Sequence, residues 1–89
     1  MYRPRATRQF KKDRNRLRKR GYDLDALTEV MRKLVAGERL GPEHRPHTLQ
    51  GEFADCWECH IKSDWLLIWR IQGDELVFIR TGTHSDLFD

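Results

Sequence analysis

The hydrophobic residues in the first half of the chain recur with the period of an α-helix. The clearer pattern predicts a helix over residues 24–35, where apolar side chains return every three or four positions. Asp23 supplies a side chain that can cap its first turn, and Gly37 follows its last turn as a stop. A thinner apolar stripe predicts another helix from Thr7 to about Arg20.

In the second half of the chain the period changes to two, as expected for β-strands. Residues 56–62 alternate between two faces, whereas residues 65–71 are almost continuously apolar. A continuous run of this length is typical of a central strand that is buried on both faces. Gly73-Asp74 predicts a tight turn, and residues 76–80 then form the other strand of a hairpin.

Two further segments complete the expected fold. Residues 2–6 predict a short strand, which Pro4 restricts to the edge or the end of a sheet because proline has no N–H to donate. Residues 38–48 are rich in glycine and proline and predict a loop. The whole pattern predicts a single α+β domain over residues 1–89, with two N-terminal helices packed on one face of a small, mostly antiparallel sheet.

Composition narrows the class of protein. With 38% hydrophobic residues, three Trp, four Phe and two Tyr, the chain carries too much apolar surface to stay disordered. No run approaches the ~20 apolar residues that a membrane span needs. The first residues lack an apolar stretch, so we expect no signal peptide and a cytoplasmic protein whose two cysteines are reduced.

The charge is concentrated at one end of the chain. The first twenty residues hold ten Lys or Arg and one acid, Asp13, whereas residues 21–89 hold seven basic and thirteen acidic residues. Clustered Lys and Arg bind phosphate backbones, so the pattern favours nucleic acid as the partner over a solvated helix face or an acidic protein. The candidate RNA contacts on the predicted first helix are Arg8, Lys11, Lys12, Arg14, Arg18 and Lys19.

Polar residues in and beside the predicted sheet supply candidate chemistry. They are His44, His47, His60, Asp64, Arg80 and His84. Phosphodiester transfer needs a base, an acid and a cation at the phosphorus, and these side chains provide all three near neutral pH. If RNA is the substrate, its own 2′-OH can be the nucleophile, so the chemistry requires no metal or other cofactor.

A cysteine motif offers a competing interpretation. Residues 56–60 have the C-x-x-C-H spacing of c-type haem attachment, and with His44 or His47 the same side chains would offer zinc ligands. The segment alternates as a strand does, so Cys56 and Cys59 are expected on opposite faces of the sheet. We therefore favour two reduced cysteines within a sheet over a haem or zinc site.

Five short blocks in the second half of the chain form a specific set. They are residues 47–51 (HTLQG), His60, residues 64–69 (DWLLIW), residues 80–84 (RTGTH) and Leu87-Phe88. Together with the length, the basic first helix and the helix–helix–sheet order, they resemble the YafQ branch of the RelE/ParE toxin superfamily over nearly the whole chain.

This resemblance implies a RelE-like fold and a bacterial type II toxin that enters the ribosomal A site, cleaves mRNA there and is held inactive by a cognate antitoxin. It assigns the active-site residues position by position: His47, His60 and Asp64, one of which is the general base, Glu58 as a secondary acidic residue, Arg80 at the scissile phosphate, His84 as the general acid, and Phe88 beside the base or the phosphate. The partners it implies are ribosomal RNA, mRNA and the antitoxin, and we expect the free protein to be a monomer. We expect His84 to lie in an exposed C-terminal tail.

Two other functions are compatible with parts of the pattern. A ParE-like gyrase inhibitor on the same fold would have no need of His47, His60 and His84. A non-catalytic RNA-binding module would need only the basic helix, and replacing His84 would leave its function unchanged. The histidines therefore favour the ribonuclease over both alternatives.

Overall fold

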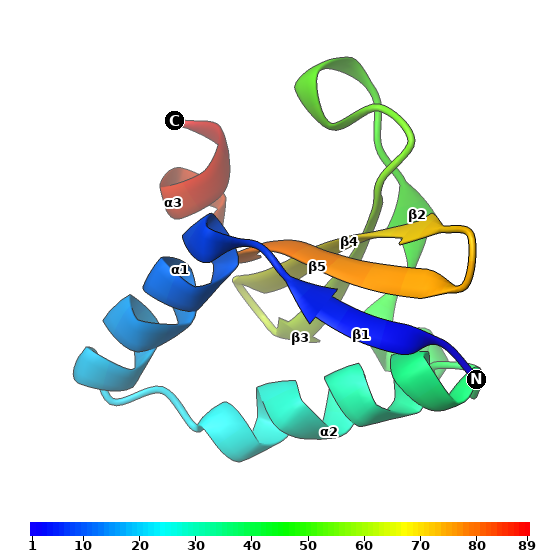
Figure 1. The fold of residues 1–89 in the computed structure, drawn as a ribbon. Coiled ribbons are helices and arrows are strands. Elements are labelled where there is room, and N and C mark those ends of the chain that lie inside the picture. The colour runs from blue at the N-terminus through cyan, green and yellow to red at the C-terminus, as the bar shows by residue number, and fades with distance from the viewer.

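Five strands form one sheet in the order β1-β5-β4-β3-β2 in the computed structural model, which describes residues 1–89 (Figure 1). The strands are β1 (Arg3–Ala6), β2 (His47–Thr48), β3 (Trp57–Lys62), β4 (Trp65–Gln72) and β5 (Glu75–Gly82). The helices are α1 (Arg8–Lys19), α2 (Leu24–Ala36) and α3 (His84–Phe88), with short 3-10 turns η1 (Pro42–His44) and η2 (Gly51–Phe53). Strand β1 runs parallel to β5, and all the other neighbours are antiparallel, which confirms the predicted α+β class.

The two long helices begin and end where the sequence predicts. Thr7 accepts a hydrogen bond from the N–H of Phe10 at 3.0 Å and caps α1, and Asp23 caps α2 in the same way. Gly21 and Gly37 follow the helices with φ of +88° and +78°, a left-handed conformation that glycine adopts without steric cost.

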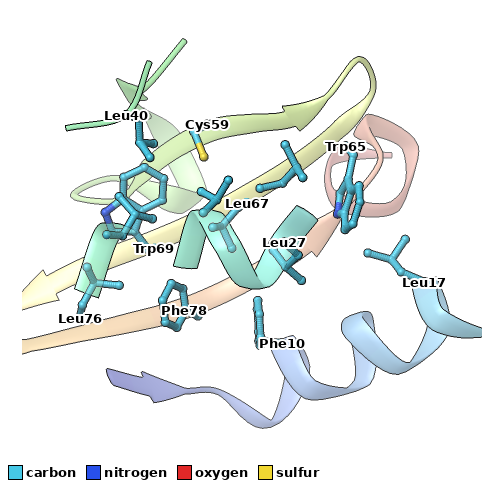
Figure 2. Packing of buried hydrophobic residues seen from close by; sticks show 13 residues of the cluster. Phe10, Leu17, Leu27, Leu40, Cys59, Trp65, Leu67, Trp69, Leu76 and Phe78 are labelled. Atoms are coloured by element: carbon cyan, nitrogen blue, oxygen red, sulfur yellow. The ribbon is translucent and has the colours of Figure 1, made fainter. Parts of the chain in front are cut away.

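The main core lies between one face of the sheet and the helices α1 and α2 (Figure 2). Leu67 and Trp69 of β4 face this core, whereas Leu66 and Ile68 belong to a second apolar cluster on the other face. All four are at most 4% exposed, so β4 is the central strand buried on both faces that its apolar run predicts. The side chains of the main core in Figure 2 include Phe10, Leu17, Leu27, Cys59, Leu67, Trp69 and Phe78.

The opposite face of the sheet is covered by α3 and by the segment around η2. Leu87 of α3 is buried there against the sheet, and Phe53 of η2 packs onto the same cluster. The prediction of an exposed tail is therefore wrong for the backbone around His84, which forms a short helix, although the His84 side chain itself is 58% exposed. Five residues are too few to show a helical period in the sequence.

The edges of the sheet are short. The glycines and prolines of residues 38–48 predict only a loop, but His47 and Thr48 form β2, paired with Glu58 and Trp57 of β3. Two residues cannot display an alternating pattern, so this strand is defined only by its partner. At the other edge, Arg3 and Thr7 donate their N–H groups to β5 and its preceding turn, so Pro4 faces outward as predicted.

None of the helices has both the length and the apolar composition to cross a membrane.

Replacing Phe10 by alanine is expected to lower the free energy of unfolding by about 3–5 kcal/mol, because it leaves a cavity in the main core. The ring is fully buried and lies 5.7 Å from the ring of Phe78. Urea denaturation measures the change. Ile71→Ala, at a side chain that is 44% exposed, is the control and should cost less than about 1 kcal/mol; equal losses would contradict this picture of the core.

Candidate active site

Four of the predicted site residues come together where β3, β4, β5 and α3 meet. His60 lies on the face of β3 opposite the main core, because its neighbours Cys59 and Ile61 face that core. Asp64 lies in the turn between β3 and β4, and His84 is the first residue of α3. The rings of His60 and His84 lie 6.2 Å apart, and Phe88 lies 6.3 Å from His84 on the other side.

A carboxylate orients the imidazole of His84. Oδ1 of Asp64 lies 2.5 Å from Nδ1 of His84 and also accepts the backbone N–H of His84 at 3.1 Å. These hydrogen bonds lower the pKa of Asp64 below its ordinary value, so the carboxylate stays ionised near neutral pH. An ionised acceptor at Nδ1 holds a proton on that nitrogen, which leaves Nε2 to act on a substrate.

The helix that carries His84 is held by a capping box and an ion pair. Thr83 accepts from the N–H of Asp86 at 3.1 Å, and Asp86 accepts from the N–H of Thr83 at 3.0 Å. Arg20, just beyond the end of α1, donates two hydrogen bonds of 2.8 and 3.0 Å to the same carboxylate. These contacts fix α3, and therefore His84, relative to α1.

The same contacts predict an acid-sensitive stability. The Arg20 guanidinium, and then the hydrogen bonds from Thr83, hold the pKa of Asp86 well below its ordinary value. A carboxylate whose pKa is lowered by folding stabilises the protein above its unfolded pKa of about 4, and this contribution is lost as the pH falls toward the folded pKa. We expect Asp86→Asn to be less stable than the wild type at pH 6 but to lose less stability between pH 6 and pH 3 in urea denaturation. Identical losses in the two proteins would exclude Asp86 as a source of the acid sensitivity.

An aromatic cleft adjoins the histidines. It has a volume of about 460 Å³ and lies between η2 and α3, with Phe53, Arg80 and Phe88 among its lining residues. The rings of Phe53 and Phe88 meet edge to face at 5.8 Å, and Phe88 is 47% exposed. Exposed aromatic rings beside a cation provide a stacking surface for a nucleobase next to a site for its phosphate. Phe53 was not among the predicted site residues, because nothing in its local sequence distinguishes it from a core residue.

Arg80 reaches this cleft from β5 and is held by a buried acid. Its Nε and Nη2 atoms donate to Asp13 of α1 at 2.7 and 3.0 Å. Asp13 has no exposed surface, and its contact raises the pKa of Arg80. Asp13 was not among the predicted site residues, although the sequence carries one signal for it: this single acid among ten cations lies on the apolar stripe between Phe10 and Leu17.

His47 lies apart from the His60–His84 pair and contacts Glu58 instead. Its Nε2 atom lies 3.2 Å from Oε1 of Glu58, and its Nδ1 atom lies 2.9 Å from the carbonyl oxygen of Arg45. Both ring nitrogens therefore face oxygen atoms of the protein and are not free for a substrate. Glu58 is 5% exposed and its Oε2 atom has no partner. The remaining histidine, His44, contacts the backbone of the site. Its Nδ1 atom donates to the carbonyl oxygen of His60 at 2.6 Å.

The predicted RNA-binding residues lie on α1. Five of the six have exposed side chains, and Arg14 lies 5.5 Å above the ring of Phe10. Two further cations of this segment form ion pairs within the protein, since Arg16 donates to Asp13 and Arg20 donates to Asp86. The six exposed or half-exposed residues therefore stay the candidates for RNA contacts.

The side chains of the C-x-x-C-H motif do not form one site. Cys59 faces the main core and Cys56 belongs to the cluster on the other face, as the alternation predicts. Both are free and buried, and burial raises the pKa of the Cys59 thiol to about 12. No group of three or more His, Cys, Asp or Glu residues is placed to hold a metal ion.

Comparison with known proteins agrees with the fold and the motifs. The model of a family described as "Bacterial toxin of type II toxin-antitoxin system, YafQ" matches residues 2–89. The mRNA interferase toxin YafQ of Escherichia coli K12 is 35% identical over 81 residues, which cover 90% of this chain and 88% of that protein.

Two solved structures are similar over the whole domain. The E. coli DinJ-YafQ complex contains a chain that is 31% identical with a TM-score of 0.92, and the match covers 100% of both chains. A copper-bound mutant toxin from Helicobacter pylori is 38% identical with a TM-score of 0.93, and the match covers 99% of this chain and 100% of that one. In the present chain the candidate ligands form only pairs, such as His84 with Asp64 and His47 with Glu58, and no three of them are grouped to hold a metal ion.

Proposed function

The chain belongs to the YafQ family of bacterial type II toxins, and we propose that it is an endoribonuclease that cleaves mRNA in the ribosomal A site. The observation that carries the proposal is the placement of an Asp64-oriented His84 beside His60 and next to a cleft lined by Arg80 and two aromatic rings. Such a set offers two groups for proton transfer, a cation for the phosphate and a surface for a base.

The proposed reaction begins with attack of the ribose 2′-OH on the adjacent phosphorus. His60 is the best-placed base, because its Nε2 atom has no partner in the protein and only its Nδ1 atom is contacted, by Arg45 and Ser63 at 3.4 Å. The other candidates are engaged, Asp64 with His84 and His47 with Glu58. Arg80 stabilises the charge that develops on the non-bridging oxygens. His84 donates the proton of its Nε2 atom to the 5′-oxygen that leaves. The products are a 2′,3′-cyclic phosphate, or the 3′-phosphate formed from it by water, and a 5′-hydroxyl.

The basic surface of α1 is proposed to bind ribosomal RNA. The side chains of Lys11, Lys12 and Lys19 are exposed on this helix and are free to contact phosphates. Binding through several phosphates weakens steeply as the salt concentration rises. The E. coli relative forms a complex with DinJ, and we propose that an antitoxin of the same kind holds this toxin inactive. An acidic segment of such a partner would compete for the cationic surface.

Cleavage of a defined mRNA by the purified protein, with and without programmed ribosomes, tests the proposal. We expect cuts within the A-site codon, only when ribosomes are present, and unchanged by EDTA. The cleavage should be inhibited when the antitoxin is added first. Mapping of the new ends should find a 5′-hydroxyl on the downstream fragment.

The alternatives give different outcomes in the same preparation. Loss of DNA supercoiling activity of gyrase without any RNA cleavage would support the ParE-like function. Salt-sensitive ribosome binding without cleavage would support a non-catalytic RNA-binding module. Either result, with protein shown to be folded, would refute the proposed ribonuclease.

A further inference from the structure

The strongest feature outside the predicted site is the environment of Asp13. Its side chain is completely buried although it lies on the most basic segment of the chain. Five N–H groups donate to its two oxygens: Arg80 Nε at 2.7 Å, Arg80 Nη2 at 3.0 Å, Gln9 Nε2 at 3.0 Å, Arg16 Nη2 at 3.1 Å and the backbone N–H of Thr81 at 3.2 Å. A buried carboxylate that accepts this many hydrogen bonds is tightly fixed.

The position of this carboxylate in the fold connects it to the cleft. Strand β1 ends opposite Phe78, but β5 continues to Gly82, so the outer edge of its last residues has no strand beside it. Asp13 of α1 lies at that edge and accepts the N–H of Thr81, which a neighbouring strand would otherwise pair. The same carboxylate then holds the side chain of the preceding residue, Arg80, which lines the cleft.

The geometry of the pair leaves part of the guanidinium for a ligand. Asp13 occupies Nε and one position of Nη2, whereas Nη1 has no partner in the protein. A guanidinium has five N–H donors in a rigid plane, so three remain, and they include the paired Nη1 and Nη2 positions that match a phosphate.

From these observations we propose that Asp13 is a positioning residue that fixes the guanidinium of Arg80 for contact with the scissile phosphate. This inference rests on the proposed ribonuclease function and adds a residue to its site. A free arginine side chain samples many conformations and loses this conformational freedom when it binds the transition state. A side chain that is already fixed does not have this entropic cost. Asp13 therefore acts through Arg80 and does not touch the substrate.

The test combines single and double variants in cleavage on programmed ribosomes. Asp13→Asn is expected to lower the rate at saturating ribosome concentration about 10- to 100-fold and to leave the half-saturating concentration within about twofold. Arg16→Ala is the matched control, because Arg16 contacts the same carboxylate but does not line the cleft. Its cleavage rate should stay within about threefold of the wild type.

A double variant that combines Asp13→Asn with Arg80→Ala separates positioning of Arg80 from a general effect on the structure. If Asp13 acts through Arg80, Asp13→Asn causes no further loss of rate in an Arg80→Ala protein. A folded Asp13→Asn protein that cleaves at the wild-type rate or faster overturns the inference, and so does an equal loss of rate with and without Arg80. If Asp13→Asn does not fold, Asp13→Glu replaces it, since that variant keeps the charge but displaces the guanidinium. A wild-type cleavage rate in folded Asp13→Glu would then overturn the inference.

An NMR measurement that does not depend on mRNA cleavage tests the role of Asp13 separately from the proposed function. In the wild type, the Arg80 Nε–H should exchange slowly with solvent in NMR spectra and shift when inorganic phosphate is added. In the Asp13→Asn protein the Arg80 Nε–H should exchange fast with solvent, and its shift on addition of phosphate should be smaller. Fast exchange in the wild type overturns the inference. Slow exchange and a phosphate response in a protein that does not cleave mRNA would refute the ribonuclease function alone.

Discussion

Replacing His84 by alanine is expected to lower the rate of mRNA cleavage about 10²–10⁴-fold, the usual contribution of a general acid. The leaving 5′-oxygen would then have no donor, because the remaining partner, Asp64, is an ionised acceptor. The side chain of His84 is 58% exposed and contributes little to packing, so the variant should unfold at nearly the same urea concentration as the wild type. Single-turnover cleavage on programmed ribosomes measures the loss.

Two controls define what this result means. Ser85→Ala changes the next exposed residue of α3 and should cleave at close to the wild-type rate. Asp64→Asn keeps the size of the side chain but no longer holds the proton on Nδ1, so a smaller loss than that of His84→Ala is expected. Equal cleavage by wild type and a folded His84→Ala protein would keep the ribonuclease but remove His84 from its mechanism. Failure of His84→Ala to fold would show that the residue has a structural role.

Arg80→Ala is expected to lower the cleavage rate about 10²–10³-fold, since the charge that develops at the phosphorus would lose its cation. The same replacement leaves Asp13 buried with Arg16 as its only charged partner, and we therefore also expect a loss of stability. Urea denaturation and cleavage on ribosomes are measured on the same preparations, so that the rate is compared among folded proteins only.

Arg80→Lys separates charge from geometry. Lysine keeps one positive charge, but its single ammonium group cannot hold Asp13 through two parallel hydrogen bonds and also present a planar pair of donors to a phosphate. We expect most of the stability and little of the activity to return in this variant. Full recovery of activity by lysine would mean that only the charge at this position matters.

Much of the fold was predictable because its signals are local. The periods of the apolar residues, the caps Thr7 and Asp23 and the glycines after each helix act within a few residues, so α1 and α2 begin and end close to the predicted positions. The apolar run of β4 also indicated its central place in the sheet. The same reasoning failed for β2 and α3, because segments of two and five residues take their conformation from what they pack against.

The α+β class, the two long helices and the central strand follow from the amino-acid sequence alone. So, through motifs shared with a toxin family, do the residue types of the proposed active site. Which of these residues contact one another depends on the folded structure. It pairs His84 with Asp64 across 20 positions of the chain and Arg80 with Asp13 across 67, and it separates His47 into a pair with Glu58. The reason is that strand order and register decide which distant side chains become neighbours, and no local pattern encodes that order.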